Sequence, residues 1–235
     1  MNKHLGLVIL IPLLVSAPAR ADVPTSQSLL DSLKAHQDKV KTIEADFSLS
    51  IFGVGDLTIK QKGQYTYNAP NQVVMEFTEP SHNTVKINGG EVLVSINGGP
   101  FSPVQQGETT AGMNSDIYYY HFIKQFYLVI DEKNQPAQSG LVKIIGYRKD
   151  AEGNIADEKT VRNVKALEVL FEKERGLVTQ IDFIGFETIP PMQFKMTYEN
   201  KSGLWVPKKI FARIITPGGD IASGIVMENR KVERN

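Results

Sequence analysis

The chain has 235 residues, no cysteine, and 26 basic and 26 acidic side chains, so its formal net charge at pH 7 is zero. The absence of cysteine excludes disulfides, thiolate metal sites and the lipidated cysteine of bacterial lipoproteins, so we expect a hydrophobic core alone to stabilise the chain. A balanced charge argues against nucleic acid as a partner.

Residues 1–21 have the features of a secretory signal peptide. Lys3 precedes an apolar run over residues 5–15, and small residues close the segment at 19–21. The run of about 11 residues is shorter than the roughly 20 that a spanning helix needs, which favours a cleaved signal over a membrane anchor. We expect one mature domain, residues 22–235, that is soluble and large enough to bury a core of its own.

The mature chain begins with one expected amphipathic helix, over residues 25–41. Apolar side chains recur at Leu29, Leu30, Leu33 and Val40, and lysines occupy the last turns. The candidate N-cap residues are Thr25, Ser26 and Ser28.

The clearest strand signal is a β-hairpin over residues 61–77. Large apolar and polar side chains alternate over 63–68 and again over 73–77, so one face of the pair is apolar. Between them, the proline of Ala69-Pro70-Asn71 fixes its own φ and favours a turn.

The same alternation predicts strands along most of the remaining chain. They are expected near residues 46–51, 57–59, 85–87, 92–96, 142–144, 167–171, 181–183, 192–198, 205–207, 210–214 and 221–227. Polar segments at 105–114 and 149–163 interrupt the series. The fold class is therefore mainly β (α+β): a single curled antiparallel sheet of about 11 strands with helices covering its concave apolar face.

The most aromatic segment, residues 117–130, is expected to be a helix capped by Asp116. Its apolar stripe would contain Tyr119, Phe122, Ile123, Phe126 and Tyr127. Two interpretations stay open: a core helix, or a lid across the concave face whose aromatic side chains line a site for an acyl chain.

Catalytic signals are weak in this sequence. His36, His82 and His121 have no metal-ligand spacing, and neither a nucleophile elbow nor a phosphate-binding loop occurs. The Gly53-x-Gly55 pair is typical of a hairpin turn, and residues 150–154 of a solvated hairpin tip. We expect a protein that is not an enzyme and that has no cofactor and no metal.

Four segments in order resemble the outer-membrane lipoprotein carrier family (LolA-like). They are residues 40–47 (VKTIEADF), 63–71 (GQYTYNAPN), 77–80 (FTEP) and 88–90 (NGG), within a resemblance that covers residues 29–100. The resemblance implies an unclosed β-barrel around an apolar cavity, in a protein of the Gram-negative periplasm. It also implies a carrier that takes the acyl chains of lipoproteins from an inner-membrane transporter to an outer-membrane acceptor, and we expect a monomer.

One position departs from the family pattern. Lipoprotein carriers have an arginine immediately before the proline of the second hairpin, where it latches the lid, and this chain has Ala69 there. Either the lid is held differently, or the cargo is another lipid or a glycolipid.

The alternation predicts which side chains line the lipid pocket. They are Phe47, Leu49, Tyr65, Tyr67, Met75, Phe77, Val94, Phe122, Phe126, Val169, Phe171, Phe183, Phe194 and Met196. A dry core would give the same pattern. An alternative from another class is a periplasmic lipid-sensing module that acts on a protein partner, similar to regulators of an envelope-stress anti-sigma factor.

Overall fold

The structure, a computed structural model, describes residues 25–54, 57–89, 91–104, 117–138, 140–148, 165–184 and 190–235. The expected signal peptide (residues 1–21), the expected helix cap Asp116 and both polar segments, 105–114 and 149–163, lie outside these residues. Where side chains are discussed below, they belong to the described part of the chain.

One antiparallel sheet of thirteen strands dominates the fold, and its order is β6-β5-β4-β3-β2-β1-β13-β12-β11-β10-β9-β8-β7. The strands are β1 (Val40–Val54), β2 (Leu57–Asn68), β3 (Gln72–Glu79), β4 (Asn83–Asn88), β5 (Glu91–Ser95), β6 (Ser102–Pro103), β7 (Tyr127–Ile130), β8 (Leu141–Tyr147), β9 (Lys165–Glu172), β10 (Leu177–Phe183), β11 (Met192–Lys201), β12 (Leu204–Ile214) and β13 (Ile221–Arg234).

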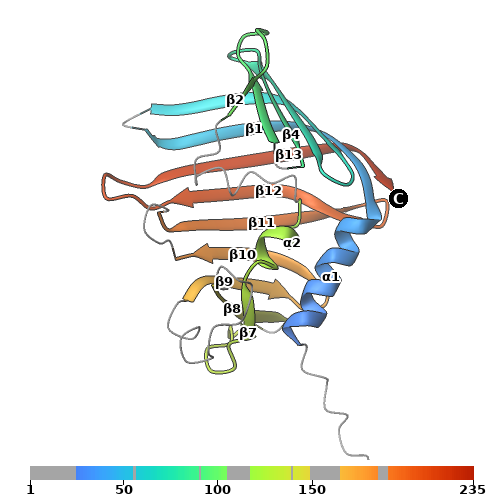
Figure 1. Cartoon of the computed structure of the whole chain (residues 1–235), viewed down its shortest axis with the longest axis vertical. Coiled ribbons are helices and arrows are strands. Elements are labelled where there is room, and N and C mark those ends of the chain that lie inside the picture. The colour runs from blue at the N-terminus through green and yellow to red at the C-terminus, as the bar shows by residue number, and fades with distance from the viewer. Residues whose placement is uncertain are drawn as a thin grey trace, which may run out of the picture.

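The strand order shows how the chain builds the sheet. The chain starts in the middle with β1, runs outward strand by strand to β6, restarts at the opposite edge with β7 and returns to the middle with β13. The two edge strands β6 and β7 are not paired with each other, so the curled sheet is unclosed (Figure 1). The expected fold class is confirmed, although thirteen strands replace the expected eleven. The short strands β6 and β7 were not expected, whereas residues 57–59 and 63–68 form one strand, β2, and residues 205–207 and 210–214 form one strand, β12.

Helix α1 (Ser26–Lys39) agrees with the expected first helix. The side chain of Thr25 caps it by accepting a hydrogen bond from the backbone N–H of Ser28 at 3.1 Å. Leu29 and Leu33 are buried against the sheet. The chain then passes directly into β1, and Figure 1 shows α1 lying across the concave face.

The expected helix over residues 117–130 is wrong. Helix α2 contains only Tyr120–Ile123, and Tyr119 before it has a left-handed φ of 60°. Residues Tyr127–Ile130 instead form β7, which pairs with β8. A segment that is apolar all round fits both helical and strand periodicity, and its β-branched and aromatic end favours a strand once an edge is available for pairing.

Two glycines in the central strands differ in the space around them, so substitutions at the two positions test how tightly this sheet packs. A Cβ on Gly63 would lie 2.1 Å from the backbone oxygen of Glu76 and 2.8 Å from the ring of Phe47, whereas a Cβ on Gly224 would meet nothing within 4 Å. We expect Gly63→Ala to lower the free energy of unfolding by roughly 1–3 kcal/mol because β2 and β3 must move apart. Gly224→Ala is the matched control, and chemical denaturation of both variants is the measurement. Equal stability of the two variants would contradict the packing described here.

Candidate functional site

The concave face is apolar along continuous rows of paired residues. One row crosses nine strands, from β2 to β7, and all but one of its side chains are apolar. Its members are Ile59, Ile51, Ser223, Ala212, Phe194, Ile181, Val169, Ile144 and Ile130. Alternation in each strand, combined with pairing in register, therefore collects apolar side chains on one face.

The predicted pocket residues of the strands all belong to this face. A second row runs through Val94, Val85, Met75, Tyr65 and Ala45, and a third through Leu49, Ile225, Ile210 and Met196. Phe47 and Phe77 are joined through Gly63, and their rings meet edge to face at 5.2 Å between centroids. Tyr67, Phe171 and Phe183 pair with the further apolar residues Ile43, Val142 and Leu167.

Burial divides the predicted residues into two groups. The first is packed into the core and consists of Phe47, Tyr67, Val169, Phe171, Phe183 and Met196. The second is half-buried and consists of Leu49, Tyr65, Met75, Phe77, Val94, Phe122, Phe126 and Phe194. Only the second group leaves apolar surface that a ligand could contact without displacing a side chain. Their role in binding stays a prediction.

Sequence reasoning missed the part of this face that the last two strands contribute. Ile210, Ala212, Ser223 and Ile225 are half-buried members of the rows above. The short side chains of Ala212 and Ser223 reach less far from the sheet than those of Phe194 and Ile51 beside them. The alternation of Ile221, Ser223, Ile225 and Met227 was the available signal.

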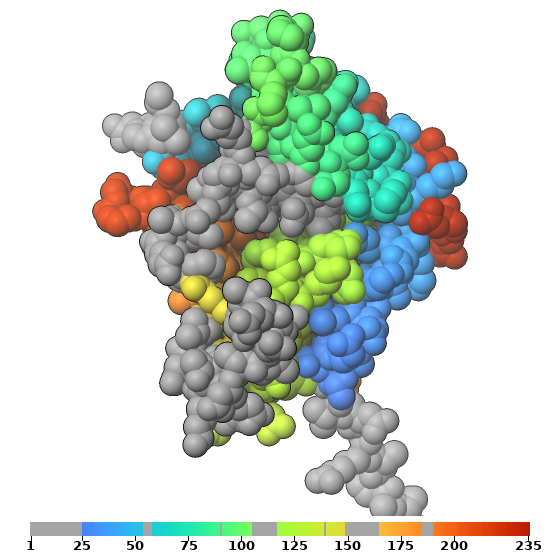
Figure 2. Space-filling model, viewed as in Figure 1, coloured from blue at the N-terminus to red at the C-terminus, as the bar shows by residue number. Residues whose placement is uncertain are grey.

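Two segments cover part of the face. Helix α1 contacts β7, β10 and β12, and it also contacts α2. In Figure 2 the segment around α2 (yellow-green) and α1 (blue) lie side by side over the sheet. The Phe122 ring lies 6.3 Å from that of Phe183, and the Tyr119 ring lies 5.8 Å from that of Phe194. The aromatic segment therefore lies over the apolar face, as both interpretations of the sequence require.

Tyr118 anchors the covering segment. Its side chain is fully buried, its hydroxyl donates a hydrogen bond to the backbone oxygen of Trp205 at 2.5 Å, and its ring stacks on Tyr198 at 6.3 Å. Burial raises the pKa of this phenol, so it remains a donor at neutral pH. This chain, which lacks the arginine of the lipoprotein carriers, thus has an anchor elsewhere in the covering segment.

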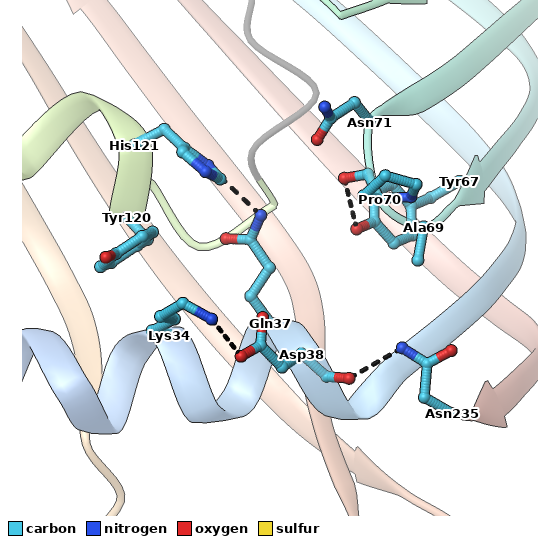
Figure 3. A pocket seen from close by; sticks show the side chains of 10 residues that line it. All are labelled: Lys34, Gln37, Asp38, Tyr67, Ala69, Pro70, Asn71, Tyr120, His121 and Asn235. Carbon is cyan, nitrogen blue, oxygen red and sulfur yellow. Dashed lines mark hydrogen bonds and ion pairs between the residues drawn. The ribbon is translucent and has the colours of Figure 1, made fainter.

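The position that carries the latch in the family opens here onto a cavity. Ala69 holds the hairpin against the first strand by donating its N–H to the oxygen of Lys41 at 2.8 Å. A cavity of about 430 Å³, which we name the hairpin cavity, lies between this turn, α1 and α2 (Figure 3). Its lining residues are Lys34, Gln37, Asp38, Tyr67, Ala69, Pro70, Asn71, Tyr120, His121 and Asn235. Tyr67 is the one predicted pocket residue among them.

A second cavity, of about 370 Å³, opens mainly on the opposite face of the sheet. It is lined by Asp46, Phe47, Ser48, Lys62, Gly63, Gln64, Thr78, Glu79, Val226 and Glu228. Ser48 pairs with Lys62 and Val226, one position away from the row of Phe47. Its charged lining is unsuited to an acyl chain.

Removing the Tyr118 hydroxyl tests whether its hydrogen bond to Trp205 anchors the covering segment. We expect Tyr118→Phe to lower the free energy of unfolding by about 1–3 kcal/mol because a buried carbonyl loses its donor. Tyr127→Phe is the matched control, since that hydroxyl makes no hydrogen bond to the residues that the structure describes. Denaturant unfolding of both variants is the measurement, and equal midpoints would show that the hydroxyl does not anchor the segment.

His36 predicts a pH dependence for the attachment of α1. Its Nε2 lies 2.5 Å from the backbone oxygen of Arg175, and burial, aided by the charge of Lys39, holds its pKa below the ordinary value. Folding therefore favours the neutral ring. The contribution of the neutral His36 ring to the free energy of unfolding is complete above pH about 6.5 and is lost as the pH falls through the lowered pKa of the folded state. We expect the melting temperature to fall from pH 7.5 to pH 5, and His36→Gln, which keeps a donor but cannot titrate, to fall less. Parallel curves for the two proteins would rule out this role.

Comparison with known proteins gives a likeness at the level of fold. No protein-family model and no curated protein matches the sequence. Among solved structures, a LolA superfamily protein from Nitrosomonas europaea matches with a TM-score of 0.62 at 12% identity, over 91% of this chain and 94% of that one.

Two further structures support the same assignment. A putative outer membrane lipoprotein-sorting protein domain from Vibrio parahaemolyticus has a TM-score of 0.62 at 7% identity, covering 88% of this chain and 91% of that one. A DUF1329 family protein from Desulfovibrio piger has a TM-score of 0.61 at 11% identity, covering 91% and 94%. The described helices include none with the length and apolar character needed to cross a membrane.

The three likenesses in fold confirm, over nearly the whole chain, the resemblance expected from residues 29–100. This protein has the LolA-like fold.

Proposed function

We propose that the protein is a periplasmic, non-enzymatic carrier that holds the acyl chains of lipoproteins, or of another lipid, on the concave face and moves them towards the outer membrane. The observation that carries the proposal is the half-buried apolar surface that continues beyond the core of this face, under and beside the α2 segment. Similarity in fold to a lipoprotein-sorting domain supports the same class of cargo.

The energetics favour a site of this kind for an acyl chain. Each methylene group hidden from water contributes about 0.8 kcal/mol, so binding needs apolar area and no charged partner. The row from Ile51 to Phe194 supplies that area across four neighbouring strands, with the short side chains of Ala212 and Ser223 at its centre. Such a carrier would receive its cargo from an inner-membrane transporter and release it to an outer-membrane acceptor.

Reversible release requires that the cover can move. The α2 segment has only one turn of helix, and its described contacts include ring contacts, the Tyr118 hydrogen bond and the contact between Gln37 and His121, all of which can separate without breaking the sheet. A rigid core segment would be tied down by backbone pairing, as β7 is.

Native mass spectrometry of the purified mature protein, followed by organic extraction, is the first experiment. A co-purifying acyl lipid or lipopeptide is the expected result. A ligand-free mass with no uptake of added lipid would contradict the carrier proposal and leave a protein-binding regulatory module as the interpretation.

A pair of phenylalanine variants locates the site. We expect Phe194→Glu to weaken binding of a hydrophobic dye that palmitate displaces, by at least about tenfold, because a carboxylate would lie in the apolar row beneath Tyr119. Phe211→Glu is the matched control, since Phe211 is exposed and pairs with Lys195, one position away from the pair of Phe194 with Ala212. Unchanged dye binding by Phe194→Glu would place the site elsewhere. Ser223→Phe, which fills the same row without adding charge, provides a second variant if Phe194→Glu does not fold.

A further inference from the structure

The hairpin cavity differs chemically from the apolar face beside it. Its lining brings together an amide, an ion pair and an imidazole from α1 and α2, opposite the turn that joins β2 to β3 (Figure 3). The Lys34 ammonium and the Asp38 carboxylate form a contact pair, and the side-chain amide of Asn235 donates to the backbone oxygen of Asp38 at 2.8 Å. The two opposite charges balance, which suits a neutral or zwitterionic group better than an anion.

Gln37 supplies the feature that points to a ligand. Its side chain is 6% exposed, and Figure 3 shows it reaching from α1 towards α2 within the ring of lining residues. Its Nε2 lies 3.5 Å from Nδ1 of His121, while its Oε1 has no hydrogen-bond partner among the described residues. A buried acceptor without a donor is destabilising, and a ligand N–H or O–H placed here would satisfy it.

Tyr67 lies between this cavity and the half-buried Tyr65 and Met75 of the apolar face. It lines the cavity, and on the sheet it pairs with Ile43 and Val73, in the row next to that of Tyr65 and Met75. Its hydroxyl donates to the oxygen of Pro70 at 3.2 Å, so the polar end of the ring points to the turn while its body belongs to the core. An amphiphile could therefore place its chain on the face and its polar end in the cavity.

We infer that the hairpin cavity is the head-group site of an acylated ligand, and that it selects a neutral or zwitterionic head that carries O–H or N–H donors. This inference rests on the proposed function, because the acyl chain of the same ligand would lie on the concave face. Ala69 contributes to this site, because its methyl group leaves open the space that a long side chain would fill. Hydroxyls of a glyceride or sugar and amides of a lipopeptide share the required chemistry.

Dye displacement with three ligands of equal chain length tests the inference. Monopalmitoylglycerol carries hydroxyl donors, palmitoylglycine amide carries amide donors, and methyl palmitate carries neither. We expect wild type to bind at least one donor-bearing ligand about tenfold more tightly than methyl palmitate, the ratio that one buried hydrogen bond provides. The preferred ligand identifies whether hydroxyls or amides are recognised.

Two glutamine-to-methionine variants on α1, one inside the cavity and one outside it, show whether the Gln37 amide causes the preference. Gln37→Met keeps the length of the side chain without its amide, and we expect it to lose the preference while methyl palmitate binds as before. Gln27→Met is the control on the same helix, because Gln27 is exposed and hydrogen bonds only to Asp31 at 2.8 Å among the described residues. Ala69→Met fills the cavity from the hairpin side and should also remove the preference, which covers the case in which Gln37→Met fails to fold.

The possible outcomes separate this inference from the proposed function. Equal binding of all three ligands by wild type, or a preference that survives in Gln37→Met, overturns the head-group site and leaves the carrier proposal standing. Failure of every ligand to displace the dye overturns both.

Discussion

The pairing of β1 with β13 is the contact on which the rest of the structure depends. It joins the first and last strands of the chain from Val40 to Phe52, and it unites the meander β1–β6 with the meander β7–β13 into one sheet. Without it, the row that crosses from Ile51 to Phe194 would be divided between Ile51 and Ser223. The apolar face, and any ligand site on it, therefore depends on a contact between segments about as far apart in sequence as the chain allows.

Two regions of the apolar face differ in how far they are covered. Near α1, the face is buried by packing, and Leu33, Ile181 and Leu177 lie in the main hydrophobic core. Towards β1, β2 and β3, a separate small cluster around Phe47 and Met227 is bordered by half-buried Leu49, Phe77 and Ile225. The first region stabilises the fold, and the second leaves apolar surface uncovered, which is where the proposed carrier function would place a ligand.

In the proposed carrier, polar groups at the rim of the apolar face would orient a bound ligand. A purely apolar face would accept any chain in either orientation, because dispersion and the hydrophobic effect are not directional. Hydrogen-bonding groups confer orientation, and Gln37, His121 and Asn71 line one cavity where α1, α2 and the β2–β3 turn meet. Ala69, at the position where lipoprotein carriers have an arginine, lines the cavity between these groups.

The sequence by itself determined the strands and the face that each presents, because alternation is a local property: Met192 to Tyr198 could be assigned without knowing any partner. The same alternation placed the twelve predicted pocket residues of the strands on one face, and the resemblance of segments in the first half of the chain to the LolA-like family indicated the fold. Only the tertiary structure decided that residues 127–130 form an edge strand, that β1 lies beside β13, and that Gln37 meets His121 beside the hairpin turn. Each of these depends on pairing or packing between distant segments, whose free energy no local pattern contains.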